Sequence, residues 1–296
     1  MGTESKHLLD LSVEDFNKFL DSFDHVLSDC DGVIWTQNPL PRVGEFFKQM
    51  KKRGKTVNFV SNNSIRSRAN YEAQFKAAGI DNGFESLIIP SIAVAEYLKS
   101  ATFNKTVYCV TCTETKRVLE AHGFKCKEGP DLGPEYYGEY IQYLEDDEEI
   151  GAVVFDSDFR INLPKMYRAI TYLKRPEVLF INGATDRSVP MKPGLLALGT
   201  GVFADLVTAE VKREPVLLGK PGKAFGEFAM KRAGITDPSR VLFIGDMIAQ
   251  DVSLGKAVGF NTLLVLTNTT KEEMLSHTIR PDYYAASLGS IVPLIQ

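Results

Sequence analysis

The chain alternates between short apolar runs and stretches whose apolar residues recur at helical spacing. The apolar runs predict strands at residues 25–28, 56–60, 107–110, 152–155, 178–181, 216–218, 241–244 and 262–266. The last three runs are continuous, which is typical of parallel strands covered on both faces. Helices are predicted between the strands, for example at residues 13–20, 67–78 and 164–173. This alternation along the whole chain predicts an α/β fold with right-handed crossovers.

Two loop-rich or charged segments, near residues 86–90 and at 209–215, interrupt the alternation and indicate joints between domains. The length of 296 residues is more than one ordinary hydrophobic core usually serves. We therefore predict a discontinuous core domain of residues 1–87 and 210–296, with an inserted domain of residues 88–209 that has its own strands.

Polar clusters follow four of the predicted strands. They are Asp29-Cys30-Asp31-Gly32, Ser61-Asn62-Asn63-Ser64, Gly219-Lys220-Pro221, and Gly245-Asp246 followed by Asp251. Taken singly, an Asp-x-Asp or a Gly-Asp after a strand is most often a turn or a helix cap. If one parallel sheet holds all four strands, however, their carboxyl ends open on one crevice, which is where ligands bind in such sheets.

A crevice of this composition has a clear chemical use. Clustered carboxylates repel one another unless a cation binds, and oxygen ligands suit Mg²⁺. A metal and Lys220 together can neutralise the charge of a phosphoryl group in transfer. A free carboxylate can then be the nucleophile and form an aspartyl-phosphate. On a regular strand Asp29 and Asp31 would share a face, and the following Gly32 permits a local unwinding. One aspartate can attack while the other serves as acid and base.

The four clusters resemble, in order, the four motifs of haloacid dehalogenase-type phosphatases. The first motif is Asp29-Cys30-Asp31-Gly32-Val33-Ile34-Trp35, and the others begin at Ser61, Lys220 and Gly245. The extension after Gly32 and the Asn-Asn-Ser sequence resemble the 4-nitrophenylphosphatase-like subgroup, which includes phosphoglycolate phosphatase and pyridoxal phosphate phosphatase (chronophin). The resemblance covers nearly the whole chain. It implies a Rossmann-like parallel-sheet core with a large inserted α/β cap domain of the C2 type, in agreement with the joints above.

The resemblance also implies roles for the acidic residues and the lysine. Asp29 attacks phosphorus and binds Mg²⁺, and Asp31 protonates the leaving oxygen and then activates water, while its backbone carbonyl binds the metal. Asp246 is the remaining direct protein ligand of the metal. Lys220 bridges the phosphate and the nucleophile, and Asp251 orients metal-bound water or the lysine without binding the metal itself.

Other residues are expected to bind the substrate. By the same resemblance Ser61 hydrogen-bonds a phosphoryl oxygen, Asn62 lines the entrance, and Asn63 lies beside them in the motif. The segment from Gly183 to Pro190 resembles the substrate loop of the cap, so Asp186 and Arg187 are expected to touch the leaving group. An ordinary turn with a solvated arginine explains that pair equally well.

Three positions depart from the family pattern. Relatives often have Arg or Asn where Met247 stands, Thr where Gln250 stands, and Tyr where Ser157 stands. The acidic positions are intact, so activity is expected to survive while substrate orientation near the fourth motif changes. Cys30 lies between the two aspartates, and its oxidation is a hypothesis; the flanking carboxylates disfavour its thiolate. Cys109-x-x-Cys112 lacks a second pair and is not expected to bind zinc.

Composition and charge disfavour some classes of binding partner. Hydrophobic residues make up 44% of the chain and charged residues 24%, as in folded soluble proteins. The formal net charge of −4 disfavours nucleic acid and an anionic membrane surface as partners. Four cysteines, no membrane-length apolar run and no secretory signal at the start favour a cytoplasmic location. A homodimer through the cap is expected only because it is common in the resembling family.

The leading interpretation is a Mg²⁺-dependent phosphatase of small phosphate esters. Because a large cap restricts access, small substrates are favoured over folded phosphoproteins, and a protein phosphatase is the second hypothesis. A catalytically weak ligand-binding or scaffolding protein is the third. The intact Asp29, Asp31, Lys220 and Asp246 argue against it, whereas Met247 and Gln250 leave it open.

Overall fold

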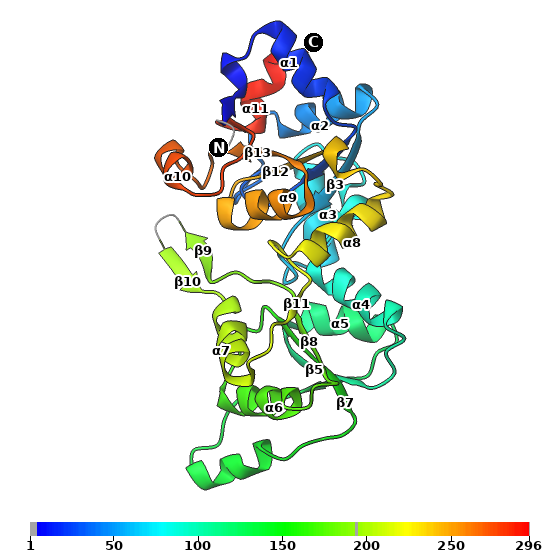
Figure 1. Ribbon diagram of the computed structural model, residues 1–296, viewed down its shortest axis with the longest axis vertical. Helices are drawn as coiled ribbons and strands as arrows, with labels where there is room; N and C mark the ends of the chain where they lie inside the picture. Colours follow the sequence, from blue (N-terminus) through cyan, green and yellow to red (C-terminus); the bar gives the residue numbers. More distant parts are fainter. Residues whose placement is uncertain (1–4, 193–194, 296) are drawn as a thin grey trace. The chain divides into compact units, whose positions relative to one another are not determined.

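The computed structural model describes residues 5–192 and 195–295, and it divides them into two compact units (Figure 1). The core unit consists of the chain up to Ser61, Ser67–Ile88, and the chain from Lys220 onward. The inserted unit consists of Asn62–Arg66 and Ile89–Gly219. Residues 1–4, on which the expectation of no secretory signal rests in part, lie outside the described residues. None of the described helices is both long and apolar enough to span a membrane.

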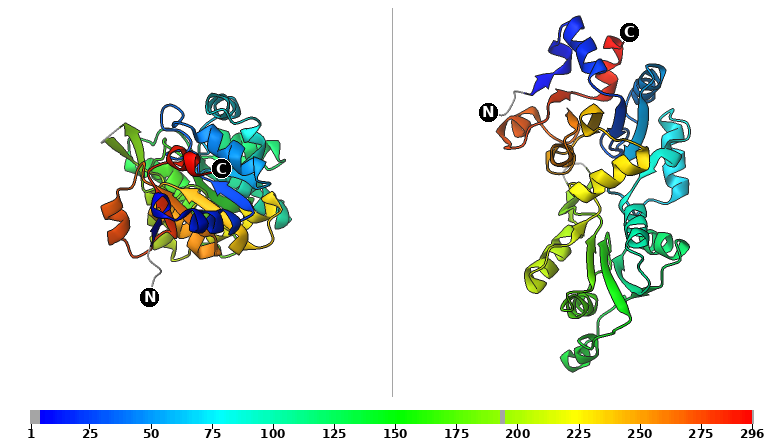
Figure 2. Two further views of the ribbon diagram at one scale, coloured as in Figure 1. Left: turned by 90° about the horizontal axis from the view of Figure 1, so that it is seen from above. Right: turned by 45° about the vertical axis from the view of Figure 1, so that its right-hand side comes forward.

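The core unit is built on a parallel sheet of seven strands in the described chain, in the order β1-β14-β13-β12-β2-β3-β4. The strands are β1 Lys6–His7, β2 His25–Ser28, β3 Thr56–Val60, β4 Leu87–Ile88, β12 Val241–Gly245, β13 Asn261–Val265 and β14 Tyr283–Ala285. Every residue of β12 is buried, so both faces of the sheet are covered at its centre. Figure 2 shows helices on both sides.

The helices of the core unit begin where the sequence supplies caps. They are α1 Val13–Asp21, α2 Val43–Lys52, α3 Arg68–Ala77, α8 Lys223–Ala233, α9 Ser253–Val258, α10 Lys271–Ser276 and α11 Leu288–Ile291. The hydroxyls of Ser12 and Ser67 accept hydrogen bonds from the backbone N–H groups of Asp15 and Asn70 at the starts of α1 and α3. Short 3₁₀ or π turns lie at Leu8–Asp10, Gly83–Ser86, Pro238–Arg240, Ile248–Val252 and Val292–Leu294.

The inserted unit has its own parallel sheet, in the order β11-β8-β7-β5-β6. Its strands are β5 Thr106–Thr111, β6 Cys126–Glu128, β7 Ile150–Asp156, β8 Leu179–Asn182 and β11 Val216–Leu217, and β9 Ser188–Lys192 pairs with β10 Leu195–Leu198 in an antiparallel hairpin. Its helices are α4 Pro90–Ser100, α5 Thr113–Ala121, α6 Leu163–Leu173 and α7 Gly201–Val211, with a 3₁₀ segment at Tyr137–Tyr143.

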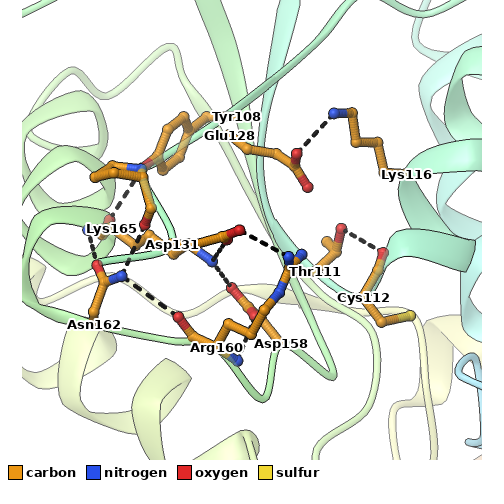
Figure 3. A network of polar contacts seen from close by, with 11 residues as sticks. Tyr108, Thr111, Cys112, Lys116, Glu128, Asp131, Asp158, Arg160, Asn162 and Lys165 are labelled. Carbon is orange, nitrogen blue, oxygen red and sulfur yellow. Dashed lines mark hydrogen bonds and ion pairs between the residues drawn. The ribbon is translucent and has the colours of Figure 1, made fainter. Parts of the chain in front are cut away.

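A buried ion pair anchors the start of α6 in the inserted unit (Figure 3). The Lys165 ammonium lies 2.7 Å from the Asp158 carboxylate, and both side chains are almost fully buried. Asp131 approaches the same ammonium at 3.8 Å and pairs with Arg160 at 3.0 Å. Asn162 caps α6 by accepting from the Lys165 backbone N–H, and its amide donates to the Pro130 carbonyl. These contacts fix the loop before the 3₁₀ segment against α6.

The predicted α/β class, with a Rossmann-like core and an inserted α/β domain, is confirmed. The eight predicted strands are all present, with ends that shift by up to two residues. The condition that one sheet holds all four polar strand ends is not met, because β11 pairs with β8 of the inserted sheet. For the same reason the second joint lies between Gly219 and Lys220, whereas the charged segment had placed it before residue 210.

Candidate active site

Three neighbouring strands of the core sheet end on candidate residues. Strands β12, β2 and β3 lie side by side and run parallel, so their carboxyl ends share one edge. Asp29 follows β2, Ser61 follows β3, and Asp246 follows β12. The backbone N–H of Asp29 continues the ladder by donating to the carbonyl of Ile244. The sheet therefore brings these three side chains to one place, as the strand-end argument requires.

Lys220 joins this group from the chain that leaves β11. Its ammonium lies 2.8 Å from Oδ1 of Asp29 and 2.7 Å from Oδ1 of Asp251, and only 3% of its side chain is exposed. Burial alone would lower the pKa of Lys220, but the carboxylates of Asp251 and Asp29 raise it above its ordinary value. The lysine is therefore a permanent buried cation between two carboxylates.

Asp251 lies in the π-helical turn Ile248–Val252, and both of its oxygens already have partners. Oδ1 accepts from Lys220, while Oδ2 accepts from the backbone N–H groups of Asp246 (3.0 Å) and Met247 (2.9 Å). A carboxylate held in this way orients the lysine and the start of the turn after β12.

The site fits a divalent cation. Asp29, Asp246 and Asp251 each offer an oxygen within 4.8 Å of the others, all three are buried, and the described residues contain no other such group of acidic, His or Cys ligands. The single positive charge of Lys220 balances only part of the negative charge of the three carboxylates. Burial, reinforced by Asp251, raises the pKa of Asp246 to about 7, and burial raises the pKa of Asp29 well above its ordinary value even beside Lys220. A bound cation would remove this cost, because it favours the charged carboxylates.

The turn that carries Asp31 is held closely against Asp246. Strand β2 ends at Ser28, and the Cys30 carbonyl accepts from the N–H of Ile34 at 2.8 Å, so Asp31 lies in a turn that begins just after Asp29 and not on a regular strand. Gly32 has φ +82°, and a Cβ there would lie 2.1 Å from Oδ2 of Asp246. The buried indole of Trp35 donates to Oδ1 of Asp31 at 3.0 Å. Only glycine at position 32 allows this close approach.

Ser61 is buried and follows β3, the strand that lies next to β2 and therefore next to Asp29. Its backbone N–H donates to the carbonyl of Ile88, and its hydroxyl accepts from the Tyr71 phenol at 3.2 Å. Only 1% of the residue is exposed. The hydroxyl is thus held at the edge of the sheet by α3.

Sequence reasoning missed three polar residues that follow β13. Asn268 donates from Nδ2 to Oδ2 of Asp246 at 2.5 Å, Thr269 donates to the Asp246 carbonyl at 2.6 Å, and Thr267 donates to the Gly32 carbonyl at 2.5 Å. β13 lies next to β12. The strand-end rule that selected the four clusters, applied to the apolar run at 262–266, would have found them.

The remaining candidates belong to the inserted unit. The Asn62 amide donates to Oδ2 of Asp186 at 3.2 Å, which joins two of the predicted substrate residues. Oδ1 of Asn63 accepts from the backbone N–H groups of Ile65 and Arg66, so this side chain stabilises a turn. The exposed guanidinium of Arg187 pairs with Asp205 on α7.

Comparisons with known proteins agree with this geometry. Two family models match the chain: haloacid dehalogenase-like hydrolase at residues 26–125, and a HAD-hydrolase-like family at residues 217–291. Phosphoglycolate phosphatase 2 of Arabidopsis thaliana is 33% identical over 295 residues, which is 97% of this chain and 98% of the relative. The chain belongs to the haloacid dehalogenase-like hydrolases. Within them it is a phosphatase of the subfamily of 4-nitrophenylphosphatases and phosphoglycolate phosphatases that carries a C2 cap.

Two further relatives of this haloacid dehalogenase-like phosphatase extend over nearly the whole chain. Human glycerol-3-phosphate phosphatase is 27% identical and spans 100% of this chain and 98% of its own. The structure of p-nitrophenyl phosphatase from Archaeoglobus fulgidus is similar with a TM-score of 0.77 at 28% identity, over 92% of this chain and 99% of that one. The inserted unit is thus the cap domain of the family.

Proposed function

We propose that this chain is a Mg²⁺-dependent hydrolase of small phosphomonoesters that works through an aspartyl-phosphate on Asp29. The observation that carries the proposal is the buried Lys220 bridge between Asp29 and Asp251, within a carboxylate triad able to hold a metal ion. Asp29, Asp246 and the backbone carbonyl of Asp31 would hold Mg²⁺, which would supply positive charge to the transferring phosphoryl group.

The protein residues then divide the two half-reactions between them. A carboxylate oxygen of Asp29 attacks phosphorus, a P–O bond to Asp29 forms, and the bond to the leaving oxygen breaks. Asp31 gives its proton to the leaving oxygen, then takes a proton from the water that cleaves the aspartyl-phosphate. Lys220 stabilises the negative charge on the phosphoryl oxygens and holds Asp29 ionised and aimed, because it already lies 2.8 Å from Asp29.

The turn supports this assignment of acid and base. Asp31 is half-buried and accepts a hydrogen bond from the Trp35 indole N–H, whereas Asp29 is buried and forms an ion pair with Lys220. Two carboxylates in such different surroundings suit separate tasks. Asn62, Asn63, Asp186 and Arg187 are proposed to contact the substrate, with the hydrogen bond from Asn62 to Asp186 fixing the substrate loop of the cap.

The names of the relatives indicate the substrate class. They are phosphatases of phosphoglycolate, glycerol 3-phosphate and p-nitrophenyl phosphate, all of which are small monoesters. We propose a substrate of this size for the present chain.

The test uses 4-nitrophenyl phosphate, whose leaving group needs no protonation. Wild-type protein should turn over with Mg²⁺ and stop in EDTA, and the isosteric Asp29→Asn variant should be inactive. Asp31→Asn should form the phosphoenzyme and hydrolyse it slowly, so that its intact mass rises by one phosphoryl group. The exposed Asp237→Asn serves as a matched control and should behave like wild type. Turnover by Asp29→Asn at the wild-type rate would refute the proposal.

A substrate screen follows if the first test succeeds. Short phosphorylated acids and polyols should be hydrolysed with higher kcat/KM than a phosphopeptide. A phosphopeptide cleaved as fast as the small esters would instead support a protein phosphatase.

A further inference from the structure

We propose that Asn268 is a positioning residue of the metal site: its amide holds one oxygen of Asp246 and leaves the other oxygen for the cation. This inference rests on the proposed function, since it concerns the metal that the function needs. The Thr267-Asn268-Thr269 segment follows β13, the strand beside β12, and it belongs to none of the four motifs.

The contact is short and part-buried, because it joins an exposed amide to a buried carboxylate. Asn268 Nδ2 lies 2.5 Å from Asp246 Oδ2, and Asp246 is 2% exposed. An N–H that donates to a carboxylate forms a strong hydrogen bond, which fixes the side-chain rotamer of that carboxylate. Gly32 lies beside both atoms of this hydrogen bond, because a Cβ there would lie 2.1 Å from Asp246 Oδ2 and 2.7 Å from Asn268 Nδ2. Oδ2 is therefore enclosed by Asn268 and the turn that carries Asp31.

The neighbouring threonines bind backbone instead of the carboxylate. Thr269 donates to the Asp246 carbonyl, and Thr267 donates to the Gly32 carbonyl. The three side chains together connect the end of β13 to Gly32 and to Asp246. Of the three, only Asn268 donates to the side chain expected to bind metal. This division makes Thr269→Val a matched control, since it removes one hydrogen bond to the same residue and leaves the carboxylate contact in place.

Partners of this kind determine metal affinity. Hydrogen bonds that orient a ligating side chain typically contribute about 10–100-fold to metal affinity. A different role is available to the same side chain, because the amide oxygen of Asn268 could itself bind the cation. The two roles respond in opposite ways to Asn268→Asp. A carboxylate has no N–H to donate and repels Asp246, whereas as a direct ligand it binds a divalent cation more tightly than an amide oxygen does.

The experiment measures binding of Mn²⁺, a paramagnetic divalent ion, to the EDTA-stripped full chain by electron paramagnetic resonance, without substrate. The dissociation constant should rise about 10–100-fold in Asn268→Ala. It should also rise in Asn268→Asp, and it should stay at the wild-type value in Thr269→Val. Hydrolysis of 4-nitrophenyl phosphate at saturating Mg²⁺ should change less than the metal affinity does.

Each other outcome is decisive. Wild-type affinity in Asn268→Ala, tighter binding in Asn268→Asp, or a wild-type protein that binds no Mn²⁺ would each overturn the inference. If Asn268→Ala does not fold, the nearly isosteric Asn268→Asp decides. Metal binding is measured without turnover, so the outcome for Asn268 and the outcome for the proposed function can be told apart. Weaker Mn²⁺ binding by Asn268→Ala, together with no hydrolysis by the wild-type protein, would contradict only the proposed function.

Discussion

Replacing Gly32 by alanine tests whether the turn at the first motif holds the metal ligand in place. Alanine at φ +82° carries a backbone cost of about 1–2 kcal/mol. The added Cβ also lies 2.1 Å from Oδ2 of Asp246, so the carboxylate must move by roughly 1 Å to reach an acceptable contact. A displacement of that size at a reacting centre can cost about 100-fold in rate, or about 2.7 kcal/mol of transition-state stabilisation.

Gly79→Ala is the matched control, because Gly79 has φ +71° and no atom within 4 Å of the added Cβ. Both variants should lose stability in urea unfolding, Gly32→Ala by at least as much as the control. Only Gly32→Ala should lose about 100-fold in kcat/KM with 4-nitrophenyl phosphate. Wild-type kcat/KM in Gly32→Ala, or an equal loss in Gly79→Ala, would refute the argument from the close approach.

Three further predictions concern charge and hydrogen bonding. Burial raises the pKa of Asp246 from 3.8 to about 7, so the folded metal-free protein binds more protons than the unfolded chain. Its free energy of unfolding in EDTA should therefore fall by up to about 4 kcal/mol as pH rises through this range. Asp246→Asn should make this free energy depend less on pH. Lys165→Met leaves the buried Asp158 without its closest cation and should cost about 3–5 kcal/mol in urea unfolding, most of which Asp158→Leu in the same chain should restore. Tyr71→Phe removes the donor to Ser61 and should cost about 1 kcal/mol of stability, which thermal unfolding would reveal.

Much of the fold and most of the core site could be predicted from local sequence. Strands β2, β3 and β12 are apolar runs that stop at polar residues, and parallel pairing then places Asp29, Ser61 and Asp246 at one edge. Lys220 was predicted as a site residue with the strand before it placed in the core domain, whereas β11 pairs with β8 of the inserted sheet. β11 has only two residues, and an apolar run reveals a strand but not the strand with which it pairs.

Contacts between distant segments were beyond the sequence pattern. The place of Thr267-Asn268-Thr269 after an apolar run would have marked it as a candidate, but the run does not show that Asn268 contacts Asp246, which lies in a different strand–helix unit. A local unwinding at Gly32 could be anticipated, but the hydrogen bond from the Trp35 indole to Asp31 and the close approach of Gly32 to Asp246 could not. Both cases depend on close packing between segments, which periodicity does not encode.

The division of the chain at Ile88–Ile89 and Gly219–Lys220 has a consequence for how such enzymes diversify. The block Ile89–Gly219 contains Asp186 and Arg187, the proposed contacts to the leaving group, but it contains neither Asp29 nor Lys220. A genetic exchange of that block would bring in a new recognition surface. The carboxylates of the reaction centre are encoded outside the block and would stay unchanged. Selection can therefore change which metabolite is bound while the chemistry is inherited unaltered.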